Sequence, residues 1–143
     1  MEAKELRIGN IIGRQFINRR PQQDNTVKTD IFLEPCTVNE IKESSVNISD
    51  LGRNMRVIVQ YEYVSPIPIT PEWLERFGFK KHLAFEKRID EKNSIAYSVP
   101  NTLTSIYTMG ALVQFCHIKY VHQLQNLFYA LTGGELTLKT ESK

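Results

Sequence analysis

The sequence predicts an α+β fold in which a mostly antiparallel β-sheet carries a short mid-chain helix and a longer C-terminal helix. Three observations predict it: apolar and polar residues alternate over 55–64, Thr70-Pro71 begins a helix, and apolar residues recur at helical spacing over 119–131. The 143 residues, 41% hydrophobic and 24% charged, have an ordinary globular composition. We expect one domain over residues 1–137 and a flexible tail over residues 138–143.

The N-terminal part predicts short strands, with a small barrel-like character. Residues 6–16 alternate but are interrupted by Gly9 and Gly13, which favours a bent or bulged strand. Residues 18–29 are polar and contain Pro21, so we expect a long loop there. Strands are predicted over 31–41, 45–51 and 55–64, the last being the strongest because it alternates and is rich in β-branched residues.

The middle of the chain predicts a helix of at most two turns. Prolines in residues 65–68 end the preceding strand, because proline cannot donate to a sheet ladder. Thr70 suits the N-cap, and Pro71 suits the first helical position, where a backbone N–H has no partner. Trp73 and Phe77 give an apolar side, and Gly78 suits the end of the helix.

The C-terminal part predicts a β-meander followed by a helix. Residues 83–89, 94–99 and 102–118 have strand character, with turn signals at Asn93 and at 100–101. The final helix is expected over 119–131, ended by Gly133 and Gly134. Its apolar stripe comprises Tyr120, Leu124, Leu127, Phe128 and Leu131.

Several classes of protein are disfavoured by simple observations. The N-terminus lacks the pattern of a signal peptide, and no apolar run approaches the roughly 20 residues of a membrane helix, so we expect a cytoplasmic protein. Cys36 and Cys116 are expected to be reduced, with Cys116 a small core residue. No nucleophile elbow or phosphate-binding glycine loop is present. We expect no enzyme, no cofactor and no metal, although residues that converge in space leave an unrecognised hydrolase open.

Charge is sparse in the C-terminal part, where Lys119 is the one charged residue between positions 93 and 134. Two interpretations stay open. The segment forms the centre of the domain, or part of it is buried by another subunit, since interface cores are depleted of charge. We favour a homo-oligomer, because a domain of this size has difficulty hiding so long a segment.

Three blocks of the chain resemble a family of small phage and prophage proteins of Bacteroidetes-type bacteria. They are residues 6–10 (LRIGN), 67–79 (IPITPEWLERFGF) and 118–133 (IKYVHQLQNLFYALTG), of which the last is the most specific. The chain departs from the family pattern at Gly134, where an acidic residue is more usual. The resemblance implies a mobile-element origin, and small phage proteins of this kind include replication accessories, DNA-binding factors and inhibitors of host defence.

The final helix carries a candidate polar face. His122, Asn126 and Tyr129 stand at i, i+4 and i+7, so they share one side of the helix and can hydrogen-bond a ligand or partner. The alternative, which we favour, is an ordinary solvated helix face. His117 and His122 lie five apart, which is not the spacing of a helical metal pair.

Two basic clusters are candidate ligand sites. The first comprises Arg14, Arg19 and Arg20, whose planar guanidinium groups suit phosphate recognition. The second comprises Lys80, Lys81, His82 and Arg88, with Arg76 and Lys87, interleaved with Phe77, Phe79 and Phe85. Basic residues bind phosphates and aromatic rings stack on bases. The alternative, favoured for the second cluster, is that the phenylalanines are core and the cations form a solvated rim.

The leading hypothesis is a non-catalytic, oligomeric host-defence inhibitor of phage type. It captures a small anionic, nucleotide-like ligand or blocks a host protein. Its ligand pocket would lie between subunits, with Arg14, Arg19 and Arg20 on phosphates and aromatic residues on bases. The alternative is a nucleic-acid-binding accessory of phage replication or regulation, whose affinity would fall steeply with salt. A third hypothesis is a structural protein that binds no small molecule.

Overall fold

The chain divides into two compact units, Met1–Ile67 (unit 1) and Pro68–Lys143 (unit 2), where the sequence predicts a single domain over 1–137. This computed structural model describes residues 1, 3–52, 55–81, 83–99 and 102–139, except the side chains of residues 17–20, 28, 29, 114 and 115. The predicted α+β class is confirmed: within the described residues the fold is mostly antiparallel strand, with a short mid-chain helix and a C-terminal helix.

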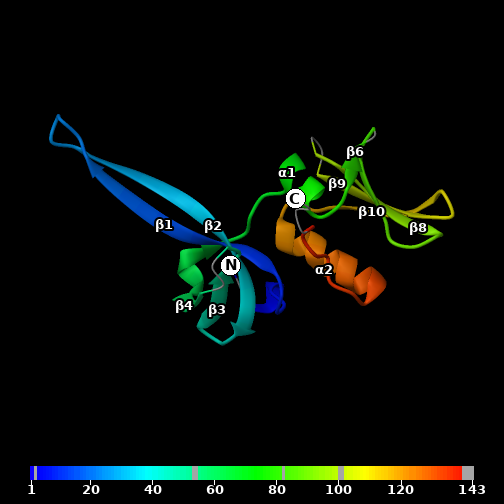
Figure 1. Cartoon of the computed structure of the whole chain (residues 1–143), viewed down its shortest axis with the longest axis horizontal. Helices are drawn as coiled ribbons and strands as arrows, with labels where there is room; N and C mark the ends of the chain where they lie inside the picture. The colour runs from blue at the N-terminus through cyan, green and yellow to red at the C-terminus, as the bar shows by residue number, and fades with distance from the viewer. Residues whose placement is uncertain (2, 53–54, 82, 100–101, 140–143) are drawn as a thin grey trace. The chain divides into compact units, whose positions relative to one another are not determined.

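Unit 1 is built on an antiparallel sheet that curves as a half-barrel, with strand order β4-β3-β2-β1-β5 (Figure 1). The strands are β1 (Ile11–Pro21), β2 (Val27–Ile41), β3 (Ser45–Asp50), β4 (Arg56–Gln60) and β5 (Val64–Ser65). Two short 3-10 helices, η1 (Ala3–Glu5) and η2 (Tyr61–Tyr63), flank them. The strand predicted over 55–64 therefore ends at Gln60, and η2 turns the chain before β5 begins.

The loop predicted over residues 18–29 is wrong, because both of its sides are strand. β1 and β2 pair without interruption from Ile11 opposite Thr37 to Pro21 opposite Val27, and the turn occupies only the residues between them. The N–H of Gln22 donates to the carbonyl of Thr26 at 2.8 Å. A ribbon exposed on both faces needs no alternation of apolar and polar residues, so its sequence resembles that of a loop.

The bulge expected within residues 6–16 is not present in the β1–β2 ladder. β1 begins at Ile11, after a turn in which Gly9 has a φ of 94°. The described irregularity of this sheet lies instead in the β2–β3 pair, between Val38 and Glu40.

The core of unit 1 fixes the base of the β1–β2 hairpin. Its buried side chains are Leu6, Ile12, Cys36, Val38, Val46, Ile48 and Val64. Gly13 lies where β2 and β5 approach β1 from both sides. A Cβ at this position would stand 3.0 Å from the Cβ of Leu33 and 3.3 Å from the carbonyl oxygen of Ser65.

Unit 2 contains the predicted β-meander, with strand order β10-β9-β8-β7-β6. Its strands are β6 (Lys80–Lys81), β7 (Phe85–Arg88), β8 (Asn93–Ser98), β9 (Leu103–Thr108) and β10 (Ala111–His117). The segment 102–118 is thus two strands, separated by Met109 and Gly110 with φ of 54° and 79°. Two successive positive φ values are typical of a tight hairpin turn.

The short helix α1 (Pro71–Arg76) forms as its sequence predicts. The Oγ1 of Thr70 accepts a hydrogen bond from the N–H of Trp73 at 3.4 Å, and Gly78, with φ of 92°, ends the turn after it. The chain returns to this helix near its C-terminus, where the N–H of Lys139 donates to the carbonyl of Arg76 at 2.7 Å. The flexible tail predicted over 138–143 therefore does not include Lys139, and residues 140–143 lie outside the described residues.

The final helix α2 (Val121–Thr132) buries its N-terminal half and exposes its last turn, so the predicted apolar stripe is buried only in part. Val121, His122, Leu124 and Gln125 are buried, whereas Leu131 is exposed. Gly133, with φ of 74°, ends the helix as predicted. In the part of the chain that the structure describes, neither helix has the length and apolar character needed to span a bilayer.

Candidate binding site

The β1–β2 hairpin projects from the sheet of unit 1 as a two-stranded arm, defined here as residues 15–21 and 27–35 (Figure 1). β5 reaches β1 only at Gly13 and Arg14, and β3 joins β2 from Cys36 onward. Among the described residues, the strands of the arm pair with one another alone. An isolated two-stranded ribbon is marginally stable in water, so its exposed faces are candidates for binding a partner.

One face of the arm carries exposed aromatic rings, and we call it the aromatic face. Phe16 and Phe32 are cross-strand partners whose exposed fractions are 39% and 51%. The guanidinium carbon of Arg14 lies 4.6 Å from the centre of the Phe16 ring, and Glu34 stands opposite Arg14. A guanidinium held over a ring is an arrangement on which a base or another planar group can continue the stack.

The opposite face of the arm is aliphatic. Ile31 and Leu33 are both exposed there, at positions that alternate with Phe32. Gln15, the partner of Leu33, donates from its Nε2 to the Oγ of Ser65 at 2.5 Å, which anchors the start of the arm to β5. This face is suited to contact with apolar protein surface.

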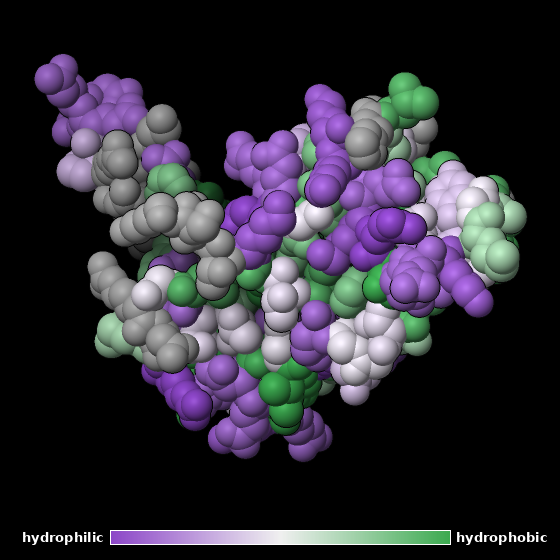
Figure 2. Space-filling model, turned by 45° about the vertical axis from the view of Figure 1, so that its right-hand side comes forward, coloured by the Kyte–Doolittle hydropathy of each residue, from purple (hydrophilic) through white to green (hydrophobic). Residues whose placement is uncertain are grey.

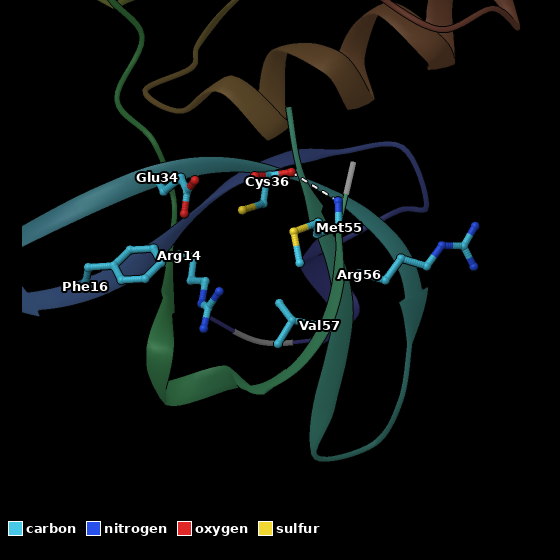
Figure 3. Close-up of a pocket in the computed structure, with 8 residues that line it drawn as sticks. Arg14, Phe16, Glu34, Cys36, Met55, Arg56 and Val57 are labelled. Carbon is cyan, nitrogen blue, oxygen red and sulfur yellow. Dashed lines mark hydrogen bonds between the residues drawn. The ribbon is translucent and has the colours of Figure 1, made fainter. Parts of the chain in front are cut away.

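A cleft of about 360 Å³ opens where the aromatic face meets the sheet (Figure 3). Phe16, Cys36, Met55 and Val57 supply its apolar lining, and Arg14, Glu34, Asp50 and Arg56 supply its charges. Figure 3 shows Arg14 beside Phe16 and Glu34, whereas the Arg56 side chain is directed away from the other labelled residues. Asp50 accepts a hydrogen bond from the N–H of Met55 at 3.2 Å. Arg14 is therefore the cation best placed to meet a ligand in this cleft.

The thiol of Cys36 lies in this cleft and is not an activated nucleophile. Burial, with the negative charges of Glu34 and Asp50, raises its pKa to about 11, against a smaller lowering effect of Arg14. The thiolate is the reactive form of cysteine, so a raised pKa disfavours nucleophilic chemistry here. The sequence predicts that Cys116 is a small core residue, but Cys116 is only half-buried, and Cys36 is the cysteine that lies in the core.

Arg19 and Arg20 do not share the cleft with Arg14 as the predicted small-ligand pocket requires. They stand five and six positions farther along the same extended strand, roughly 17–20 Å away at about 3.3 Å per residue. Arg20 is the cross-strand partner of Lys28, so two cationic residues occupy one pair of the backbone register. Their side chains lie outside the described part of the structure. Figure 2 shows a hydrophilic surface at the turn end of the arm.

The second basic cluster forms a rim around buried rings, as the favoured alternative predicts. Phe77, Phe79 and Phe85 are buried and thus unavailable to stack on bases. Lys80, Lys81 and Arg88 are exposed, and His82 lies outside the described residues. Lys80 and Arg88 nevertheless line a second cleft together with Gly78, Glu86 and Lys87.

The polar face predicted for the final helix is wrong in both of its forms. His122 is 3% exposed, with its ring centre 6.1 Å from that of Tyr120, whereas Tyr129 is 43% exposed and Asn126 is half-buried. The three residues share one side of α2, but this side is buried at the start of the helix and exposed at its end, so it forms neither one ligand face nor one solvated face. The cause is that α2 is buried in unit 2 through its N-terminal half, which includes two polar residues, His122 and Gln125.

The aromatic face was missed in the sequence, although Phe16 and Phe32 are visible in it. Each flanks the segment assigned to a loop, and only the strand register shows that they meet. Among the described residues, no group of three or more His, Cys, Asp and Glu side chains is placed to hold a metal ion. No protein-family model, curated protein or solved structure matches this chain.

Proposed function

We propose that the protein is a non-catalytic nucleic-acid-binding accessory, whose aromatic face and adjoining cleft bind a single strand. The pair of exposed phenylalanines on a ribbon without a covering layer carries this proposal. Bases stack on exposed aromatic rings with little dependence on sequence, each contact being worth roughly 1–3 kcal/mol. Arg14 extends the same surface into the cleft.

The distribution of cations along the arm supports a polymeric anion. In the strand register Arg19, Arg20 and Lys28 lie near the turn end of the arm, whereas Arg14 lies at its base, five or six positions away, so the cations do not surround one point. A strand of nucleic acid carries a phosphate on every nucleotide, so it can follow such a series of positive charges. Like charges opposite each other, as at Arg20 and Lys28, destabilise a ribbon unless an anion neutralises them.

The experiment is a titration of a fluorescent single-stranded oligothymidine, followed by anisotropy. We expect Phe16→Ala with Phe32→Ala to weaken binding about 30-fold or more, since two stacked bases are lost at roughly 1–3 kcal/mol each. Ile31→Ala, on the aliphatic face of the same arm, is the matched control and is expected to change the dissociation constant less than twofold. Failure of the wild-type protein to bind, or equal losses in both variants, would refute the proposal.

A second function is favoured by the cleft itself, which offers Arg14, a ring and an apolar wall to a small nucleotide-like anion. In the phage setting that the sequence resemblance implies, capture of a nucleotide signal would inhibit host defence. The two functions differ in their dependence on salt. A strand that contacts several phosphates loses affinity by about 0.7 log units per contact for each log unit of salt, whereas a mononucleotide has a shallower dependence.

We also propose that the protein self-associates in the bacterial cytoplasm. The β9–β10 hairpin of unit 2 exposes Met109 in its turn and Leu112 and Val113 in β10, and Met109 is 76% exposed. This hairpin lies in the segment where charge is sparse. Contiguous exposed apolar residues are typical of surfaces that another protein covers. Sedimentation velocity tests this proposal: a species larger than 16.6 kDa supports it, and a monomer at high concentration contradicts it.

A further inference from the structure

A cleft of about 270 Å³ at the end of α1, within unit 2, is lined mainly by cationic residues. The proposed function does not involve these residues. Gly78, Lys80, Glu86, Lys87 and Arg88 line it. Lys139 reaches the same point: a Cβ at Gly78 would stand 2.9 Å from the Nζ of Lys87 and 3.3 Å from the Cε of Lys139. Lys80, Lys87 and Arg88 thus line the cleft and Lys139 lies beside it, against the single carboxylate of Glu86. The Nη2 of Arg88 also donates to the carbonyl of Glu91 at 3.2 Å.

Backbone contacts hold two of these lysines in place. The Nζ of Lys87 donates to the carbonyl of Phe77 at 2.9 Å, and the N–H of Lys139 donates to the carbonyl of Arg76 at 2.7 Å. Both carbonyls at the negative end of α1 are thereby satisfied, so they repel an incoming anion less than free carbonyls would. Among the described residues, neither lysine forms an ion pair. Burial, and to a lesser extent the charge of Lys139, lower the pKa of Lys87.

The absence of a side chain at Gly78 leaves room for the end of the Lys87 side chain beside the backbone. Its φ of 92° favours glycine, and a Cβ there would approach the ammonium group of Lys87 too closely. Glycine at this position therefore lets the ammonium group of Lys87 and the stem of Lys139 approach the backbone at the edge of the cleft. A multiply charged phosphate accepts hydrogen bonds from several N–H donors at once, which is what this arrangement offers.

We propose that the Gly78 cleft binds a phosphate group through Lys80, Lys87, Arg88 and Lys139. Its volume is slightly below the roughly 300–1,000 Å³ of typical ligand pockets, which suits a phosphate or pyrophosphate group rather than a whole large cofactor. The site lies wholly within unit 2, so it does not rest on the proposed function of the arm.

The test is calorimetric titration of the full-length protein with inorganic pyrophosphate at constant ionic strength. We expect saturable binding that Arg88→Gln and Lys139→Gln each weaken tenfold or more. Lys119→Gln, which removes an exposed positive charge elsewhere in unit 2, is the matched control and is expected to change binding less than twofold. Lys87 is left intact, because its bond to Phe77 also supports the fold.

Two results would overturn the proposal: no saturable pyrophosphate binding, or equal weakening in all three variants, which would indicate diffuse attraction to charge. The source of the phosphate is separated by repeating the titration with the single-stranded oligothymidine. If Lys139→Gln weakens only pyrophosphate, the site takes a small molecule. If it weakens both, the site takes a phosphate of the nucleic-acid backbone.

Discussion

Replacing Gly13 with alanine tests how tightly the base of the arm is packed. The added Cβ would stand 3.0 Å from the Cβ of Leu33, next to the β2 backbone, and 3.3 Å from the carbonyl oxygen of Ser65. Overpacking of this kind costs roughly 1–3 kcal/mol. The smaller conformational entropy of unfolded alanine offsets about 0.4–1 kcal/mol of that cost. We therefore expect Gly13→Ala to lower the free energy of unfolding by about 1–2 kcal/mol.

The matched control is Gly52→Ala, because a Cβ at Gly52 meets no described atom within 4 Å. This variant keeps only the entropic gain and is expected to be more stable by about 0.4–1 kcal/mol. The assay is thermal unfolding followed by circular dichroism. In a unit of this size, 1 kcal/mol corresponds to a shift of roughly 4–8 °C in Tm, so the two variants are expected to differ by about 10 °C. Equal Tm values would refute the close approach of β2 and β5 at Gly13.

Three further predictions concern single residues. Because the pKa of Cys36 is about 11, its thiol is almost wholly protonated at pH 8, and Ellman's reagent should modify it roughly 200-fold more slowly in the folded Cys116→Ser variant than in the same variant unfolded in urea. Similar modification rates in the two states would contradict the burial of Cys36. Met109→Asn should raise the free energy of unfolding, measured in urea, by about 0.5–1 kcal/mol, because Asn tolerates the positive φ and completes an Asn-Gly turn. A lower free energy of unfolding would contradict the turn geometry. Thr70→Ala should lower it by about 1 kcal/mol by removing the N-cap of α1, and an unchanged denaturation midpoint would show that the cap contributes nothing.

The elements that the sequence predicts well are those whose local chemistry agrees with their tertiary role. The start of α1 at Thr70 and Pro71 and its end near Gly78 follow from capping chemistry alone. β4 alternates because one of its faces is more buried than the other. In these cases the residue pattern and the packing specify the same structure.

The features that the sequence does not predict depend on long-range pairing. The arm is exposed on both faces, so no periodicity distinguishes it from a loop. Phe16 and Phe32 lie 16 positions apart and meet only through the register of that hairpin. The sequence does not predict the Met109-Gly110 turn, because methionine is not among the residues that favour turns. The burial of His122 and Gln125 in α2 is not predicted because buried polar side chains leave no hydrophobic pattern.

The most direct test of the central claim is to map where a single strand contacts the chain. The experiment is ultraviolet crosslinking to a bromodeoxyuridine oligonucleotide, followed by trypsin digestion and mass spectrometry. Trypsin separates Phe16 from Phe32, because they lie in the peptides 15–19 and 29–42. We predict that both peptides carry the crosslinked nucleotide and that a mononucleotide in excess does not remove it. Crosslinks confined to peptides outside the arm, or none at all, would contradict binding of nucleic acid by the aromatic face.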